Sequence, residues 1–270
     1  MKNRMAAAPY LVWMVLFIVV PLALVIVFAF TDTSGNFTFD NFSSIVDLGR
    51  IFLRSFWLAL LSSVICLLLG YPVAYTLSRM RRRRQGLVLM LLILPMWMNF
   101  LLRTYSLILL IDTNGLINQL LQSLSLPTIK IINTQFAVLI GMVYNYLPFM
   151  ILPLHTVLSS IDKNYIEAAE DLGADKFQVF AKTILPLSVP GILSGITMVF
   201  IPTISTFAIS QLLSDSTVFL FGDSIQMKFD QGLYGVGSVM SLVMIILVLV
   251  SNFLMNRFSK TSATGGRNLW

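Results

Sequence analysis

Six apolar stretches, each 19 to 27 residues long, divide this chain and leave it very few possible folds. A helix of about 20 residues crosses a bilayer, and in hydrocarbon a helix satisfies its own backbone hydrogen bonds. We expect spans at Tyr10–Phe30, Trp57–Leu77, Leu87–Ile111, Phe136–Leu154, Leu187–Leu213 and Val236–Met255. The sequence therefore predicts an all-α, polytopic membrane protein whose six transmembrane helices form one domain over residues 1–270.

The composition supports a membrane protein and argues against catalysis. Hydrophobic residues make up 57% of the chain and charged residues 11%, against roughly 25% charged residues in a soluble domain. Six spans fill most of the 270 residues, and no phosphate-binding glycine loop, nucleophile–base pair or metal-ligand cluster is visible. We therefore expect a non-catalytic protein with no metal site and no cofactor of its own.

Single residues refine the expected spans. Tyr10–Phe30 exceeds the roughly 7–15 apolar residues of a signal-peptide core, so we interpret it as a retained span. Gly191 and Gly195 have the GxxxG spacing of closely packed membrane helices, and the lone Cys66 predicts packing inside a span. Proline inside a membrane helix predicts a kink or a broken turn, here at Pro21, Pro95, Pro148 and Pro202.

The distribution of lysine and arginine predicts the orientation. With the N-terminus inside, thirteen basic residues fall on the cytoplasmic side: Lys2, Arg4, Arg79, Arg81, Arg82, Arg83, Arg84, Lys163, Lys176, Lys182, Arg257, Lys260 and Arg267. The other side keeps five, namely Arg50, Arg54, Arg103, Lys130 and Lys228. This asymmetry predicts that both termini are cytoplasmic, and it explains the net charge of +6 by membrane-surface anchoring rather than by nucleic-acid binding.

The segments assigned to the outside are acidic instead. They carry Asp32, Asp40, Asp47, Asp112, Asp215, Asp223 and Asp230. Their negative potential would favour a cationic solute at the entrance. The alternative is that they are ordinary solvated loop carboxylates, and we prefer this interpretation for any one of them taken alone.

The only long cytoplasmic segment, residues 159–186 between the fourth and fifth spans, has a helical pattern. Asp162 is placed to cap a first helix, and Gly173 is placed to end it. Asp175 is placed to cap a second piece. The apolar positions recur at helical spacing in both pieces: Tyr165, Ile166, Ala169 and Leu172 in the first, then Phe177, Phe180, Ala181 and Ile184.

The opposite face of the first helix is acidic and small. Glu167, Glu170 and Asp171 share it, and Ala168 and Ala169 keep its surface low. Such a knob suits a groove on a partner protein. An amphipathic helix lying on the membrane is the alternative, but an acidic face is poorly suited to an anionic leaflet.

The same segment resembles a known motif. Glu167-Ala168-Ala169, then Gly173, then Leu185-Pro186 resembles the EAA motif of ABC-importer permeases, whose cytoplasmic helix inserts into a cleft of the ATP-binding subunit. The resemblance implies the type I ABC-importer permease fold. It also implies that the ATPase-coupling residues are Glu167, Ala168, Ala169, Glu170, Asp171, Gly173, Leu185 and Pro186.

Further segments are similar to the spermidine/putrescine permeases of that family: Arg103-Thr104-Tyr105, Gly115 to Asn118, Tyr146 to Leu154, and Phe200-Ile201-Pro202. The resemblance implies a polyamine importer of the bacterial inner membrane with two ATP-binding subunits, which bind the ATP and Mg. It also implies a second, homologous permease and an extracytoplasmic polyamine-binding protein. An ABC permease for another small solute remains the alternative.

Polar and aromatic groups inside the spans are the candidates for a solute pathway, because such groups usually face a bundle interior or a water-filled cavity. The candidates are Trp97, Asn99, Arg103, Tyr105, Tyr144, Asn145, Tyr146, Thr203, Thr206 and Ser210. The aromatic rings suit the ammonium and methylene groups of a polyamine, although helix packing is the alternative for each ring. Arg103 would repel an ammonium group, so we expect it to pair with Asp112 or a partner's acid, or to extend outward.

A stand-alone secondary transporter or membrane enzyme is the alternative from another class. It would need coupling carboxylates or catalytic groups inside its spans. Apart from Asp112, near an outer boundary, the expected spans contain no carboxylate. The sequence therefore favours a translocation subunit that relies on a separate ATPase.

Overall fold

The computed structural model describes residues 4–32, 34–43, 45–215 and 217–264, so Lys2 and Arg267 of the orientation argument lie outside it. Its regular elements are helices, with one isolated bridge between Thr31 and Phe37. Six helical segments of this described part are long and apolar enough to span a membrane: Pro9–Ala29, Gly49–Ser78, Phe100–Ser123, Gln135–Ser160, Lys176–Ser205 and Tyr234–Phe253. The predicted all-helical class and the number of spans are confirmed.

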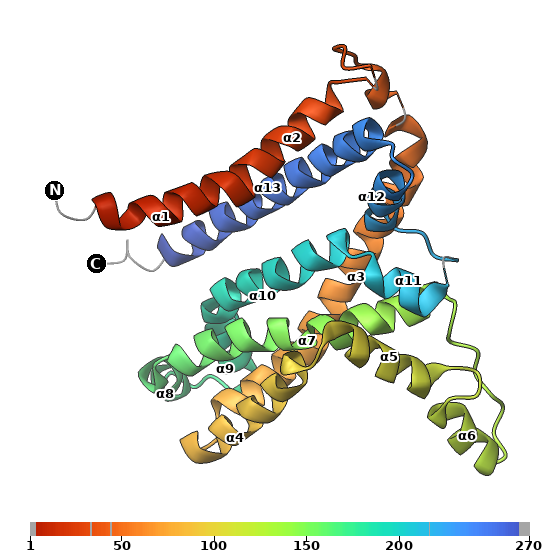
Figure 1. Cartoon of the computed structure of the whole chain (residues 1–270). Coiled ribbons are helices and arrows are strands. Elements are labelled where there is room, and N and C mark those ends of the chain that lie inside the picture. Colours follow the sequence, from red (N-terminus) through yellow and green to blue (C-terminus); the bar gives the residue numbers. More distant parts are fainter. Residues whose placement is uncertain (1–3, 33, 44, 216, 265–270) are drawn as a thin grey trace.

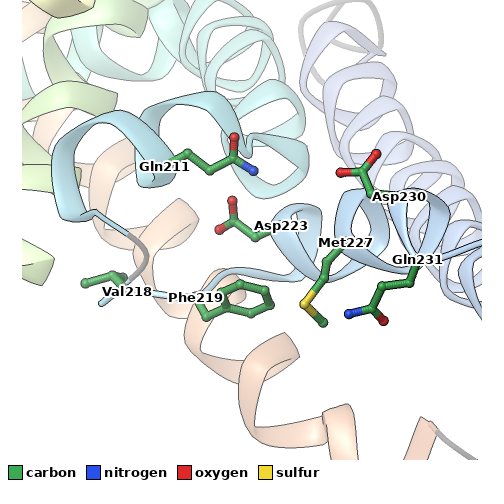
Figure 2. A pocket seen from close by; sticks show the side chains of 7 residues that line it. All are labelled: Gln211, Val218, Phe219, Asp223, Met227, Asp230 and Gln231. Carbon is green, nitrogen blue, oxygen red and sulfur yellow. The ribbon is translucent and has the colours of Figure 1, made fainter.

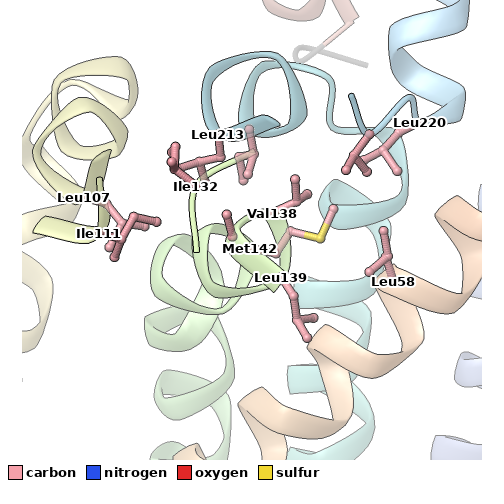
Figure 3. Packing of buried hydrophobic residues seen from close by; sticks show 12 residues of the cluster. Leu58, Leu107, Ile111, Ile132, Val138, Leu139, Met142, Leu213 and Leu220 are labelled. Atoms are coloured by element: carbon pink, nitrogen blue, oxygen red, sulfur yellow. The ribbon is translucent and has the colours of Figure 1, made fainter. Parts of the chain in front are cut away.

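Three long helices form the centre of the molecule. These are α3 (Ile45–Ser78), α7 (Gln135–Ser160) and α10 (Leu185–Ser205), which pack against one another (Figure 1). Figure 3 shows one of their apolar clusters, in which Val138, Leu139 and Met142 of α7 meet Leu58 of α3 and Leu213. Close approach of α10 to α7 depends on the predicted glycines, because a Cβ on Gly195 would lie 2.5 Å from Met150 Sδ.

A second layer lies beside this centre. The N-terminal helix runs through α1 (Arg4–Met14), the π-helical turn η1 (Val15–Val19) and α2 (Val20–Ala29). It lies alongside α13 (Tyr234–Thr264), as Figure 1 shows. Within the Pro9–Ala29 span, the most apolar stretch of 18 residues contains no buried residue, which fits a helix in contact with lipid.

The third segment of spanning length is Phe100–Ser123, whereas the expected span Leu87–Ile111 is not one continuous helix. The expected span falls on α4 (Arg82–Ile93), the 3₁₀ turn η3 (Leu94–Trp97) and α5 (Phe100–Ile111). Met98 and Asn99 are extended between them, and Asn99 caps α5 by accepting a hydrogen bond from Leu101 N at 2.8 Å. The helix breaks at Pro95, as predicted, because proline has no backbone N–H to donate to the preceding turn. A further short helix, α6 (Leu116–Ser123), follows α5.

The expected fifth span, Leu187–Leu213, is also divided. Helix α10 ends at Ser205, Thr206 is extended, and α11 (Ala208–Ser214) begins after Phe207. Pro202 lies three residues before this end, whereas Pro148 and Pro153 lie inside α7 without interrupting it. The prediction of a broken turn is thus right for Pro95, and α7 tolerates its prolines as a continuous helix.

Both ends of the described chain lie at one end of the molecule, where α8 (Lys163–Asp171) and α9 (Lys176–Val179) also lie (Figure 1). Helices α6, α11 and α12 (Phe221–Asp230) lie toward the opposite end (Figure 1). The fold therefore separates residues 159–186 from the segments that the sequence assigned to the outside.

Candidate functional site

The predicted helix caps within residues 159–186 are confirmed. Asp162 accepts a hydrogen bond from Asn164 N at 3.1 Å and begins α8. Asp175 accepts one from Gln178 N at 2.7 Å and begins α9. Each carboxylate satisfies a backbone donor that a helix N-terminus leaves free, so two short helices form from local sequence alone.

Gly173 ends α8 in the left-handed conformation, with φ of +83°. Its N–H donates to the Glu170 carbonyl at 2.9 Å, and Ala174 N–H donates to the Ala169 carbonyl at 3.1 Å. This pair of hydrogen bonds is the Schellman arrangement, which favours glycine at the position with positive φ. Gly173 thus sets the angle between α8 and α9.

The surface of this helix pair differs from the predicted one. Ile166 and Ala169 pack against the apolar cluster of α3 and α7, as an inward face should. Leu172 and Phe177 were also expected on apolar faces, yet they are 89% and 76% exposed. These two apolar side chains therefore join the exposed acidic face in one surface, whose residues are Tyr165, Glu167, Ala168, Glu170, Asp171, Leu172 and Phe177.

The inner side of the segment is anchored to α3. Phe180 makes edge-to-face contacts with Tyr71 and Tyr75, with ring centroids 5.8 and 5.7 Å apart. The Tyr71 hydroxyl and the Ser188 hydroxyl of α10 are 2.9 Å apart. A force on α8 and α9 would thus be passed to the central helices through packed side chains.

Leu185 and Pro186 lie apart from this surface in the chain. A π-helical turn, η4 (Phe180–Ile184), joins α9 to α10 without a gap, and Leu185 and Pro186 form the first turn of α10. The expected independent second helix is therefore the start of the fifth span. Sequence spacing did not predict this, because a capped apolar turn has the same pattern whether the helix stops there or continues into the next span.

Among the expected pathway residues, Arg103 and Asn145 form a buried polar contact instead. Arg103 Nε donates to Asn145 Oδ1 at 2.8 Å, and its Nη1 reaches the Pro95 carbonyl at 3.4 Å. Asn145 Nδ2 donates to the Gly141 carbonyl at 2.9 Å and lies 3.4 Å from Thr104 Oγ1. The expectation that Arg103 pairs with Asp112 or extends outward is wrong, because its partner is an amide on α7.

Other expected pathway residues have their side chains at the surface of the described chain. Trp97, Tyr105 and Tyr144 are 82%, 52% and 43% exposed, and Asn99 is exposed as well. Trp97 also lines an apolar hollow of about 350 Å³ along α4 with Met90 and Leu94 among its neighbours. These side chains are thus free to face another molecule.

The remaining candidates are built into helix packing. Thr203 is buried and donates to the Val199 carbonyl at 2.5 Å, and the Tyr146 hydroxyl donates to the Pro202 carbonyl at 3.5 Å. Thr206 is buried at the end of α10, where α12 approaches so closely that a Cβ on Gly222 would lie 2.6 Å from the Thr206 carbonyl oxygen. Thr203 and Thr206 therefore belong to the closed interior of this conformation.

The candidate Ser210 contacts Asp223, an aspartate that is buried although it was predicted to be solvated. The Ser210 hydroxyl donates to Asp223 Oδ2 at 2.7 Å, and both side chains are buried. Asp223 was grouped with solvated loop carboxylates, and for this residue that interpretation is wrong. A clue was available, because Asp223 follows an apolar run from Val218 to Phe221 that is typical of a buried segment.

Comparison with known proteins shows which protein family this chain resembles. Residues 66–262 match the family described as binding-protein-dependent transport system inner membrane component. Spermidine/putrescine transport system permease protein PotB of Haemophilus influenzae is 34% identical over 259 residues, covering 92% of this chain and 91% of that protein. PotB of Escherichia coli is 37% identical over 227 residues, covering 80% and 82%.

The fold is shared with a solved transporter. A chain of a bacterial ABC transporter that imports the acidic polysaccharide alginate superposes with a TM-score of 0.71 at 18% identity, and 96% of each chain is covered. The same values hold for that transporter in complex with a periplasmic protein bound to an alginate pentasaccharide.

These matches confirm the expected family and exclude a stand-alone secondary transporter. Members are multi-pass, non-catalytic components of the inner membrane that bind no cofactor, and ATP is bound by their partner ATPases. The chain therefore belongs to the binding-protein-dependent transport system inner membrane components and is a permease subunit of an ABC importer.

Proposed function

We propose that this permease serves the import of polyamines such as spermidine and putrescine. The observation that carries the proposal is the identity of 34–37% to PotB proteins over 80–92% of the chain. The acidic character of the segments opposite α8 and α9 supports a cationic solute. A permease for another small solute is the alternative within the same family.

In this proposal both termini and residues 159–186 are cytoplasmic. The thirteen-to-five distribution of basic residues supports this orientation, as does the position of α8 and α9 at the same end as the ends of α1 and α13. We expect a cysteine at Ala174 to react with a membrane-impermeant reagent only after the cells are opened. A cysteine at exposed Thr217 should react in intact cells, and labelling of Ala174 in intact cells would reverse the orientation.

The surface of α8 and α9 is the proposed contact with an ATP-binding subunit. It joins three carboxylates to exposed Leu172 and Phe177, so it offers both a charged rim and apolar anchors. The edge-to-face packing of Phe180 against Tyr71 and Tyr75 of α3 supports transmission of ATP-driven movement to the spans. Two ATP-binding subunits, a second homologous permease and a polyamine-binding protein complete the proposed complex.

The pathway is proposed to lie where exposed aromatic side chains of the third and fourth crossings meet the second permease. Trp97, Tyr105 and Tyr144 are the accessible candidates, since a cation–π contact requires an open ring face. The buried candidates Arg103, Asn145, Thr203 and Ser210 would support the shape of the pathway without touching the solute.

Transport by the reconstituted complex tests this function. Uptake of labelled spermidine should require ATP and the binding protein, and unlabelled spermidine or putrescine should compete where amino acids and sugars do not. Trp97→Ala should lower uptake about 2- to 30-fold if a cation–π contact worth about 0.5–2 kcal/mol is lost.

Leu109→Ala is the matched control, because Leu109 is similarly exposed but has no π face. Competition by an amino acid or a sugar in place of polyamines would reject the proposed substrate class. Equal uptake by the Trp97 variant, the control and the parent would remove Trp97 from the pathway.

A further inference from the structure

A pocket between α11 and α12 holds a carboxylate that none of the roles above employs. Its volume is about 350 Å³, and Figure 2 shows the lining side chains converging on it: Gln211, Val218, Phe219, Asp223, Met227, Asp230 and Gln231. Helices α11 and α12 lie toward the end of the molecule opposite α8 and α9 (Figure 1). In the proposed orientation this pocket therefore faces the side from which a solute arrives.

Asp223 is only 2% exposed, and its two oxygens have different surroundings. Oδ2 accepts hydrogen bonds from Ser210 Oγ at 2.7 Å and from Leu220 N at 2.8 Å. Oδ1 is buried and has no hydrogen-bond partner among the residues that the structure describes. A buried carboxylate oxygen without a hydrogen bond is destabilising, and Asp223 lines the pocket, so a ligand there that donates a hydrogen bond would stabilise this carboxylate.

The rest of the lining is rich in acceptors and carries no opposing charge. Asp230 adds a second, exposed carboxylate, whose Oδ1 accepts from Gln226 Nε2 at 3.0 Å. Gln211 lies next to Asp223 and stabilises its carboxylate, and Asp230 and Gln231 lie at the other end of α12 (Figure 2). No lysine, arginine or histidine is among the seven lining residues, so the pocket has a negative potential.

Burial raises the pKa of the Asp223 carboxyl, because desolvation disfavours its charged form. The hydrogen bonds from Ser210 and Leu220, and the nearby Gln211 side chain, oppose this effect only in part. A cation within the pocket would stabilise the ionised carboxylate and lower that pKa again. Binding of a cation would therefore favour the ionised form of Asp223.

The lining also restricts the kind of cation. The described residues contain no cluster of three or more acidic, histidine or cysteine side chains that would hold a metal ion, and two carboxylates are few for Ca²⁺. Phe219 and Met227 add apolar contact area beside the carboxylates. Apolar walls with acceptors at one side suit an ammonium group that is attached to methylene groups.

We propose that this pocket binds a terminal alkylammonium group of the arriving solute, with the Asp223 carboxylate as its principal acceptor and Asp230 as a further acceptor. The inference rests on the proposed import of a polyamine and extends it to a site on the permease itself. Capture here would hold the solute after its release from the binding protein and before it enters the space between the two permeases.

Direct binding to the complete importer tests the site. The complex, without its binding protein, is placed in nanodiscs, and equilibrium binding of labelled spermidine is measured. Asp223→Asn keeps an oxygen for Ser210 and Leu220 but removes the charge, so spermidine should bind about 10-fold more weakly. Asp230→Asn should weaken binding by a smaller factor, since its carboxylate is exposed and partly screened.

Asp215→Asn is the matched control. Asp215 is an exposed aspartate between α11 and α12 that does not line the pocket, and its φ of +43° is one that asparagine adopts readily. The control should bind spermidine like the parent. Folded protein is checked by chromatography in each case, and Asp230→Asn keeps the test informative if Asp223→Asn lowers expression.

Each outcome decides the proposal. Weaker spermidine binding by Asp223→Asn and Asp230→Asn, with normal binding by Asp215→Asn, supports it. Unchanged spermidine binding in both pocket variants overturns it. If these variants instead dock the binding protein more weakly, the pocket receives a lysine of that protein and not the solute, and the proposal is overturned as well. If the parent complex imports spermidine and the variants bind it normally, the pocket proposal fails and the proposed import of polyamines stands. If the parent complex neither binds nor imports spermidine, both the pocket proposal and the proposed import are rejected.

Discussion

Replacing Gly173 by valine is expected to lower uptake at least about 10-fold while the six-helix fold and pairing with the second permease are retained. The residue has φ of +83°, and a β-branched side chain disfavours this conformation by roughly 1–2 kcal/mol. A Cβ there would meet no atom within 4 Å, so the expected defect is conformational rather than steric. The helix end would change, and α8 would no longer present its surface at the angle that the proposed ATPase contact requires.

Gly173→Asn is the matched control for this variant. Asparagine adopts the left-handed conformation more readily than other residues with a side chain, and it ends helices at this position in many proteins. It should therefore keep most of the uptake. If valine and asparagine have equal effects, the requirement is for a missing side chain and not for positive φ.

Glu167→Lys should give the same defect by another route. Glu167 is exposed in the middle of the acidic face, and reversal of its charge would replace a charge-assisted contact worth about 1.5–3 kcal/mol by repulsion. Substrate-stimulated ATP hydrolysis and uptake are measured together in proteoliposomes, with the membrane level of each subunit. Normal hydrolysis and uptake in both Gly173→Val and Glu167→Lys would show that residues 159–186 do not couple the two processes.

The sequence predicted these local features well because local chemistry produces them. Asp162, Asp175 and Gly173 act through hydrogen bonds to residues two to five positions away, so their types and spacing were sufficient. Apolar length predicted the six spans for the same reason. Neither inference required knowledge of which helices pack together.

Features that depend on distant contacts were beyond this reasoning. Whether Asp223 is solvated or buried depends on Ser210 and on the approach of α12 to the end of α10. The exposure of Leu172 and Phe177 likewise depends on which side of α8 faces α3 and α7. A helical pattern shows that one face is apolar, but it does not show whether the fold or a partner covers that face.

The contact between Arg103 and Asn145 is the clearest such case, and it carries the second large expected effect. Asn145→Leu should destabilise the protein by about 3 kcal/mol, because among the described residues it leaves the buried Arg103 guanidinium only the 3.4 Å contact to the Pro95 carbonyl and the Tyr144 ring at 6.0 Å. Hydrogen bonds between neutral groups in membrane proteins average only about 0.6 kcal/mol, so loss of the Thr104 contact adds little. The charge on Arg103 is what makes the difference.

A double replacement separates this charge effect from a simple loss of packing. Arg103→Met with Asn145→Leu removes both polar partners, and replacement of both by apolar groups of similar shape is often close to neutral. The double variant should therefore be more stable than Asn145→Leu alone, when thermal unfolding of the purified permease is followed in detergent. Additive losses in the two single variants and the double variant would show that the 2.8 Å contact contributes no coupling energy. A recovered double variant that remains defective in uptake would instead show that this pair, which joins the broken third crossing to α7, is retained for the geometry of transport and not for stability.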